Sequence, residues 1–299
     1  MIRPNVDLDT LEDEYFTEHS HYIDVSIEED NTSFPVQIHY QDLGALEDPV
    51  ILLIHGSFSS SHTFLPWANS LVEKGYRVIM PDLPYFGLSE GFSDHITSYE
   101  RSAKVIKYLL DTLNIDKVEI ADNSLGGAVA WYFTSDYESY VRTLTLIDAV
   151  YPQEIEDNSK LKDTMKNEWL AELLSLMTPR FIVKRFLLTA YGNDTNMTED
   201  ILDRYYDLLR KDGTRKSILI NTRVRQTQDF YEEKLSNIIV PKYIMWGKKD
   251  SWISVETVNL FQDTMDIPEK NIIIYDDLGH VPMEENPSDT LLDFLSFIE

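Results

Sequence analysis

Three side chains of complementary chemistry stand at separate points of the sequence: Ser124, Asp250 and His280. A serine hydroxyl is a weak nucleophile at neutral pH, and it attacks a carbonyl carbon only when a nearby base takes its proton. A histidine can be that base, and a carboxylate behind it fixes its tautomer and stabilises the imidazolium that forms. These residue types indicate nucleophilic catalysis on an acyl group, provided that the fold brings them together.

Ser124 lies in the stretch VEIADNSLGGAVAW, which covers residues 118–131. Residues 118–121 alternate in the way of a short buried strand, and the residues after Ser124 are small and tolerated in helices. Gly126 and Gly127 stand where the strand and the helix would have to pass closely. We expect a tight strand-to-helix turn that holds the hydroxyl of Ser124 outward.

Asp250 and His280 also follow predicted strands, in the stretches WGKKD (246–250) and DDLGH (276–280). Strand and helix patterns alternate along most of the chain, which predicts an α/β fold with a doubly wound, mostly parallel sheet. Ligands bind outside the carboxyl ends of the strands in such sheets, so we expect the three side chains to meet at one edge. Strands are expected at 22–25, 35–40, 50–54, 77–80, 118–121, 141–147, 243–246 and 271–275, and helices at 62–73 and 98–113 and from 254 and 286.

The alternation is interrupted between residues 151 and 237, where only helical patterns occur. Lys and Arg outnumber Asp and Glu between Lys160 and Arg225, although the chain around this segment is acidic. Thr198 is expected to cap a helix over 201–209, and Gly213 to stop it. The sequence therefore predicts a loose N-terminal arm over 1–20, an α/β core formed by 21–150 and 238–299, and an inserted all-helical cap over 151–237.

The composition bounds the kinds of site and partner. The 299-residue chain has 26 Lys and Arg against 52 Asp and Glu, a net charge of −26, which disfavours nucleic acid and anionic membranes as partners. Without cysteine, disulfides, thiolate zinc sites and a cysteine nucleophile are impossible. The acidic start lacks a signal-peptide pattern, and the apolar run 50–54 is far shorter than the about 20 residues that span a bilayer. We expect a cytoplasmic monomer or homodimer with no membrane insertion.

Five motifs in chain order make the sequence resemble the α/β-hydrolase superfamily from about Tyr22 to the C-terminus. They are His55-Gly56-Ser57-Phe58, the loop Asp82–Ser89 that resembles DxPGxGxS, the elbow Asp122–Gly126 that resembles G-x-S-x-G, and the WGKKD and GH stretches. The sequence departs from the family pattern at two glycines, which Tyr85 and Asp122 replace. Because the elbow glycine avoids crowding between strand and helix, Asp122 must find room and a partner.

The resemblance implies a role for each candidate residue. Ser124 would be the nucleophile, His280 the base, and Asp250 the acid that orients the imidazole. The backbone N–H groups of Ser57 and Leu125 would form the oxyanion hole. A site of this kind needs no metal and no cofactor.

Other acidic and histidine residues compete for these roles. Asp148, at the end of the predicted strand 141–147, could orient the histidine in place of Asp250, although Asp250 is favoured. His55 is expected to stiffen its loop rather than to take protons. The histidines without a matching partner pattern are His19, His21, His39, His62 and His95.

The predicted cap would stand over Ser124, exclude water and roof a mainly apolar pocket. Candidates for lining this pocket are Phe58, Met177, Phe181 and Phe186.

The resemblance implies a carboxylesterase that cleaves small to medium esters through an acyl-enzyme. Two enzymatic alternatives use the same triad: a carbon–carbon hydrolase of ring-cleavage diketones, whose carboxylate the basic cap could bind, and a perhydrolase. A non-catalytic binding protein of this fold is the remaining alternative.

Overall fold

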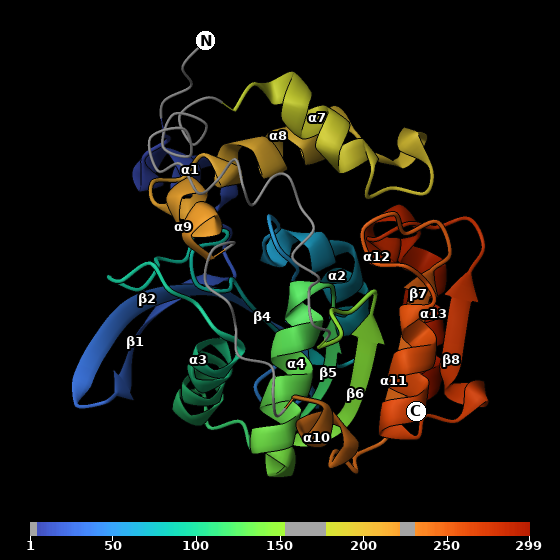
Figure 1. The fold of residues 1–299 in the computed structure, drawn as a ribbon. Coiled ribbons are helices and arrows are strands. Elements are labelled where there is room, and N and C mark those ends of the chain that lie inside the picture. Colours follow the sequence, from blue (N-terminus) through green and yellow to red (C-terminus); the bar gives the residue numbers. More distant parts are fainter. Residues whose placement is uncertain (1–4, 153–177, 222–230) are drawn as a thin grey trace.

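An eight-stranded sheet forms the centre of the protein, whose computed structural model describes residues 5–152, 178–221 and 231–299 (Figure 1). The strand order is β1-β2-β4-β3-β5-β6-β7-β8. Strands β3 to β8 pair in parallel, and only β1 and β2 run antiparallel to their neighbours, which confirms the predicted mostly parallel α/β sheet. The strands are β1 Ser20–Glu29, β2 Thr32–Leu43, β3 Val50–Ile54, β4 Arg77–Pro81, β5 Val118–Asp122, β6 Val141–Ile147, β7 Lys242–Gly247 and β8 Ile272–Tyr275.

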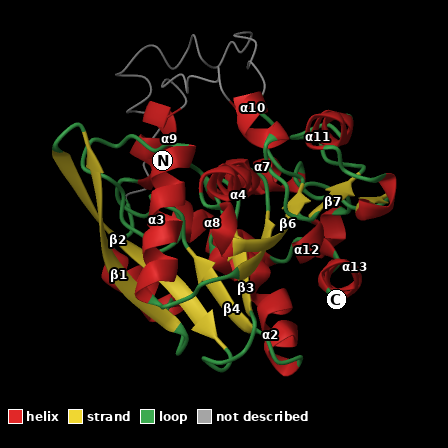
Figure 2. Cartoon of the chain, turned by 90° about the horizontal axis from the view of Figure 1, so that it is seen from below, coloured by secondary structure: helices red, strands yellow, loops and turns green. Residues whose placement is uncertain are grey.

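Helices cover both faces of this sheet (Figure 2). On β3, the side chains of Leu52 and Ile54 join one hydrophobic cluster and those of Ile51 and Leu53 join another. A strand with both faces covered reads as a continuous apolar run, as the predicted strand 50–54 does. The described helices are α1 Leu8–Tyr15, α2 Leu65–Glu73, α3 Tyr99–Thr112, α4 Leu125–Asp136, α7 Arg180–Leu188, α8 Glu199–Leu209, α9 Thr214–Asn221, α10 Tyr231–Ser236, α11 Thr257–Met265, α12 Pro282–Glu285 and α13 Pro287–Ile298.

The two hydrophobic clusters divide the helices between the faces. Trp131 of α4 and Phe261 of α11 pack in the first cluster, together with residues of α3. Trp67 of α2 and Phe294 of α13 pack in the second, with their rings stacked at 5.1 Å. Each layer of helices thus buries one apolar face of the sheet, and the strand ends remain as the edge where polar side chains can gather.

Capping residues begin several helices at the positions that the sequence predicts. The side chain of Thr198 accepts a hydrogen bond from the backbone of Ile201, and Asn286 caps α13 with Pro287 in its first turn. These caps satisfy backbone N–H groups that have no partner within the helix. Helix α8 ends at Leu209, and Gly213 adopts a left-handed φ of 83° just before α9 begins.

The N-terminal segment differs from the loose arm expected over 1–20. Residues Leu8–Tyr15 form α1, and Asp7 caps it by accepting from the backbone of Thr10. The polar helix has one buried side chain, Leu11, which packs with Leu88 and Leu208. A single apolar residue in a polar helix is too weak a pattern to predict this docking from sequence.

The helices within the predicted insert 151–237 do not all lie together. Figure 1 shows α7 and α8 beyond the ends of the parallel strands, where a cap is expected. Helix α10 instead contacts α4 and α11, and its Leu235 belongs to the first core cluster. Residues 153–177 and 222–230 of the predicted cap lie outside the described residues. Among the described helices, none is long and apolar enough to cross a membrane.

A buried guanidinium ties the β1–β2 hairpin to α3. Arg101 lies 2.7 Å from Glu29 at the end of β1 and 2.9 Å from Asp94, and its guanidinium carbon stands 4.3 Å from the ring centre of Phe34. The arginine side chain is 7% exposed, whereas both carboxylates are partly exposed. The pairing therefore joins elements that are distant in sequence through a desolvated cation.

We predict that Arg101→Met lowers the free energy of unfolding by about 2–3 kcal/mol, because both carboxylates lose their partner in a partly buried site. Urea unfolding of purified protein measures the change. Lys117→Met, which removes an exposed cation near the end of α3, is the matched control and is expected to shift the free energy by less than about 0.5 kcal/mol. Equal effects of both variants would contradict a specific role for Arg101.

Candidate functional site

Ser124 occupies a strained turn between β5 and α4. Its backbone has φ 55° and ψ −116°, in the left-handed half of φ space that only glycine visits readily. Hydrogen bonds fix the turn: the N–H of Asn123 donates to the carbonyl of Ile54 at 2.9 Å, and that of Ser124 to the carbonyl of Ile147 at 3.2 Å. The turn therefore draws on β3 and β6 as well as on β5.

Two glycines allow the helix to approach the sheet behind Ser124. A Cβ atom at Gly126 would stand 2.3 Å from the carbonyl oxygen of Ile54, which is far inside van der Waals contact. A Cβ atom at Gly127 would stand 2.3 Å from the Cβ of Ala149 and 2.7 Å from Oδ1 of Asp122. The close passage expected from the sequence is confirmed at both positions.

The side chain of Asp122 lies beside Gly127 and has only a weak hydrogen-bond partner. Its side chain is buried, Oδ1 accepts from the N–H of Ile147 at 3.4 Å, and Oδ2 has no hydrogen-bond partner in the described part of the chain. Burial raises the pKa of Asp122 well above its usual value, and the single backbone donor offsets this little. The charged form of the residue that replaces the elbow glycine is thus disfavoured by its burial.

His280 lies against Asp250 at the ends of β8 and β7. Its Nδ1 is 2.7 Å from Oδ2 of Asp250, and Oδ1 of the same carboxylate accepts from the N–H groups of Trp252 at 2.7 Å and Ile253 at 3.0 Å. The other ring nitrogen, Nε2, is buried and has no hydrogen-bond partner among the residues that the structure describes. Of the two candidate acids, Asp250 and not Asp148 thus contacts the imidazole.

Asn123 joins the turn to the histidine loop, a contact that the sequence reasoning missed. Its Nδ2 donates to the backbone oxygen of His280 at 2.9 Å and to that of Ile147 at 3.2 Å. The backbone N–H of His280 donates to the carbonyl of Ala190, just after α7, at 2.6 Å. Because the two loops are far apart in sequence, no local pattern could indicate that Asn123 bridges them.

Ser124 and His280 open into one cavity of about 300 Å³. Residues from six separate segments line it, and α7 and α8 contribute Leu187 and Tyr205. The backbone N–H groups of Ser57 and Leu125 donate to no acceptor among the described residues, so both are available to a ligand. The lining consists of Ser57, Ser59, Asn123, Ser124, Leu187, Ala190, Tyr191, Tyr205, Trp252, His280 and Val281.

The expected pocket aromatics occupy other positions. Phe58 has a left-handed φ of 64°, and its ring contacts that of Phe186 at 5.4 Å, while Phe186 stacks at 4.6 Å on Trp252. Phe181 is 71% exposed and does not line the cavity, because the buried face of α7 carries Val183 and Leu187 on the opposite side. The fourth expected residue, Met177, lies outside the described residues.

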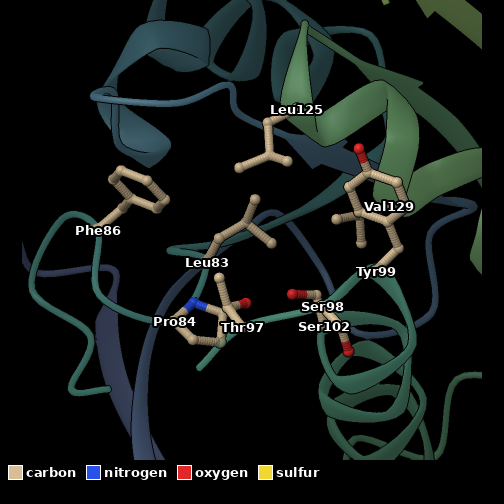
Figure 3. Close-up of a pocket in the computed structure, with 9 residues that line it drawn as sticks. All are labelled: Leu83, Pro84, Phe86, Thr97, Ser98, Tyr99, Ser102, Leu125 and Val129. Atoms are coloured by element: carbon tan, nitrogen blue, oxygen red, sulfur yellow. The ribbon is translucent and has the colours of Figure 1, made fainter. Parts of the chain in front are cut away.

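A second cavity of about 250 Å³ adjoins the turn on the far side of Leu125 (Figure 3). Figure 3 shows the side chains of Leu83, Phe86 and Leu125 directed toward this space. The lining comes from the loop after β4, from α3 and the two residues before it, and from α4. The set is mostly apolar: Leu83, Pro84, Phe86, Thr97, Ser98, Tyr99, Ser102, Leu125 and Val129. Ser124 thus lines the first cavity, and the next residue, Leu125, lines the second.

His55 and His39 support the loops around these cavities. Nδ1 of His55 donates to the carbonyl of Gly56 at 2.7 Å, and Nε2 accepts from the N–H of Leu83 at 2.9 Å, so this histidine stiffens its loop as expected. Burial lowers the pKa of His55, which keeps the ring neutral. His39, for which the sequence shows no matching partner pattern, lies 2.8 Å from Oδ2 of the buried Asp82.

Asp82 anchors the loop that follows β4. Its carboxylate accepts from the backbone N–H groups of Ser61 at 2.6 Å and Leu88 at 2.8 Å, in addition to the contact with His39. Burial alone would raise the pKa of Asp82, but the histidine and the backbone donors outweigh it and hold that pKa below its usual range. This ionised carboxylate fixes the loop that lines the second cavity.

An ion pair between Arg204 and Glu284 lies behind the wall of the first cavity. The side chains are 17% and 4% exposed, respectively. The same carboxylate accepts from the hydroxyls of Tyr191 at 2.6 Å and Tyr205 at 3.3 Å, and both tyrosines line the cavity. Arg204, whose guanidinium carbon lies 5.2 Å from the ring centre of Tyr205, is therefore paired with a carboxylate of the protein itself.

Comparisons with known proteins agree with this architecture. A sequence profile described as alpha/beta hydrolase fold matches residues 49–287. The chain is similar to a 2-hydroxy-6-oxononadienedioate/2-hydroxy-6-oxononatrienedioate hydrolase of Paraburkholderia phymatum, with 26% identity over 278 residues that cover 87% of this chain and 91% of the relative. It is also similar to Lipase 1 of Psychrobacter immobilis, with 25% identity over 86% of this chain and 79% of the lipase.

Solved structures share the fold. A probable hydrolytic enzyme from Pseudomonas aeruginosa superimposes with a TM-score of 0.77 at 18% identity, covering 99% of both chains. A thermophilic esterase from Thermogutta terrifontis superimposes with a TM-score of 0.74 at 19% identity, covering 93% of this chain and 98% of the esterase. At these identities the likeness concerns the fold alone.

We predict that Gly127→Ala destabilises the protein by about 1–3 kcal/mol, because its methyl group would overlap Ala149 in a closed core. Thermal or urea unfolding measures the loss. The double variant Gly127→Ala with Ala149→Gly removes one of the two overlapping methyl groups, and part of the stability is expected to return. Full stability of the single variant would show that helix α4 does not need this close approach.

Proposed function

The chain belongs to the α/β-hydrolase family, and on that premise we propose that it is a serine hydrolase of the carboxylesterase type. One observation carries the proposal: Ser124, on a strained turn, faces the same cavity as a histidine whose Nδ1 is held by Asp250 and whose Nε2 is unpartnered among the described residues. The N–H of His280 at Nδ1 donates to the carboxylate, so Nε2 is the acceptor that can take a proton.

The proposed reaction begins at that nitrogen. Nε2 of His280 accepts the hydroxyl proton as Oγ of Ser124 attacks the ester carbonyl, and Asp250 stabilises the imidazolium. The carbonyl oxygen gains negative charge, which the N–H groups of Ser57 and Leu125 would hold together with the N-terminal dipole of α4. His280 then protonates the leaving alkoxide, and a water molecule that it activates hydrolyses the acyl-enzyme.

The charges around the cavity favour a neutral ester. The dioate in the names of several relatives carries two carboxylates, and a hydrolase of such a substrate needs a cation to bind them. In this chain Arg204 is paired with Glu284, and no lysine or arginine is among the described residues that line the cavity. A carbon–carbon hydrolase of this kind is therefore the second candidate, supported by its named relatives and not by the charges at the cavity.

The two cavities suggest how a small to medium ester would be accommodated. One cavity contains Ser124 and His280, and the other is mostly apolar and lies beyond Leu125. We assign the mostly apolar second cavity to the acyl chain and the first to the alcohol.

We predict that Ser124→Ala lowers the turnover of p-nitrophenyl butyrate by more than about 10⁴-fold while the thermal unfolding midpoint stays nearly unchanged. A fluorophosphonate probe should label the parent protein at Ser124 and leave the variant unlabelled, as peptide mass spectrometry can locate. A folded parent protein without labelling or ester turnover would instead favour a non-catalytic binding protein, whereas cleavage of a ring-cleavage diketone with no ester turnover would favour the second candidate.

We predict that Glu284→Gln shifts the preference between p-nitrophenyl hemisuccinate and p-nitrophenyl butyrate toward the charged ester by about 10-fold or more, because Arg204 loses its counter-ion. The glutamine oxygen still accepts from both tyrosines, so their positions are retained. The ratio of kcat/KM for the two esters measures the shift. The double variant with Arg204→Gln is the control, and its preference should return toward that of the parent.

A further inference from the structure

A second buried carboxyl group lies beside the pair formed by Asp250 and His280. Asp148 follows β6, is fully buried and has a left-handed φ of 45°. One of its carboxyl oxygens, one oxygen of Asp250 and one nitrogen of His280 all lie within 4.8 Å of one another. The sequence offers Asp148 as a rival partner for the histidine, but in the structure Nδ1 of His280 hydrogen-bonds to Asp250 instead.

The two carboxyl groups differ in the donors that reach them. Asp250 receives the backbone N–H groups of Trp252 and Ile253 and the ring N–H of His280. Asp148 receives one backbone donor, the N–H of Gly247, at 3.0 Å from Oδ1, and its Oδ2 has no donor among the described residues. Three donors stabilise a carboxylate at Asp250, whereas a charge on Asp148 would be left nearly unsolvated.

The surrounding charges add to this difference. Burial raises the pKa of Asp148 well above its usual value, and the negative charges of Asp250 and Glu285 raise it further. The remaining titratable neighbours are His280, which already donates to Asp250, and Tyr275, whose hydroxyl donates to Asp293 at 2.9 Å. No cation among these neighbours compensates a second negative charge, so one proton stays on the carboxyl pair.

We propose that the neutral carboxyl of Asp148 donates its proton in a hydrogen bond to Asp250 and is a positioning residue for the catalytic histidine. This inference rests on the proposed function of Ser124, His280 and Asp250. The O–H of Asp148 gives Asp250 a fourth donor and fixes the rotation of its carboxylate. The carboxylate in turn holds the imidazole with Nε2 directed toward the cavity.

Two substitutions separate hydrogen bonding from mere filling of space. Asp148→Asn retains a donor, in the form of an amide N–H₂, and cannot ionise. Asp148→Leu has a similar size and has no donor. We expect Asp148→Asn to keep kcat for p-nitrophenyl butyrate within about 5-fold of the parent and Asp148→Leu to lose about 10- to 100-fold, with KM unchanged in both.

The pH profile gives a readout that a structural role would not move. In Asp148→Leu, Asp250 loses a donor that competes with His280 for its charge, so it should hold the imidazolium more strongly. The acid limb of kcat/KM is therefore expected at higher pH than in the parent, and the amide variant should stay close to the parent. Thermal unfolding of each variant shows whether it is folded at the assay temperature.

Two spectroscopic measurements do not depend on turnover. The infrared carbonyl band of a protonated carboxyl group should appear at neutral pH in the difference spectrum of the parent minus Asp148→Asn. The low-field NMR signal of the Nδ1 proton of His280 should shift in Asp148→Leu and change little in Asp148→Asn. If these signals behave as expected and no ester is hydrolysed, the proposed function fails while the hydrogen bond stands.

Three results would overturn the inference: absence of the infrared band, an equal loss of kcat in folded Asp148→Asn and Asp148→Leu, or an Asp148→Leu variant with the kcat and acid limb of the parent. If neither variant folds, Asp148→Ser takes their place in the difference spectrum, because another buried carboxyl such as Asp122 would contribute to the parent spectrum and cancels only in the difference. Absence of the band from that difference would overturn the inference.

Discussion

The close approach of helix α4 to strands β3, β5 and β6 is the constraint on which the rest of the site depends. Gly126 and Gly127 leave no side chain between helix and sheet, and the backbone of Ser124 can then be held at φ 55° by carbonyls of neighbouring strands. A conformation that costs about 1–3 kcal/mol persists only when the surrounding structure fixes it from several sides. Here the packing of α4 and the bond from Asn123 to the histidine loop supply that fixation.

The buried acidic groups around the site differ in the donors and cations that surround them, and three kinds of environment occur. Asp82 and Asp250 are surrounded by donors and serve as charged anchors, one for the loop after β4 and one for His280. Glu284 shares its charge with a guanidinium and two tyrosine hydroxyls. Asp122 and Asp148 have few donors, and burial raises the pKa of both. The carboxyl groups around the site therefore either receive several donors from the protein or have a charged form that burial disfavours.

The same arrangement connects the predicted cap region to the chemistry. The backbone of His280 donates to the carbonyl of Ala190, and the ring of Trp252 lies between Phe186 and the imidazole, 4.6 and 4.8 Å from their ring centres. Glu285 accepts from the N–H groups of Gly192 and Gly279. A displacement of α7 would therefore act directly on the histidine loop. Helix α7 and the loop that carries His280, the candidate base, are thus linked by direct contacts, although they are far apart in the sequence.

Sequence patterns alone determined the α/β class, the strand-to-helix turn at Ser124, the caps at Thr198 and Asn286, and the family to which the chain belongs. These features depend on residues close together in the chain, where alternation, capping residues and glycines have direct physical consequences. Only the tertiary structure decided that His39 pairs with Asp82, that Leu8–Tyr15 forms a docked helix, that Phe181 faces outward, and that Asp148 lies close to both Asp250 and His280. Each of these features depends on which distant segments pack together. The hydrophobic pattern of a sequence can indicate that one face of a helix or strand is buried, but it does not indicate which segment covers that face.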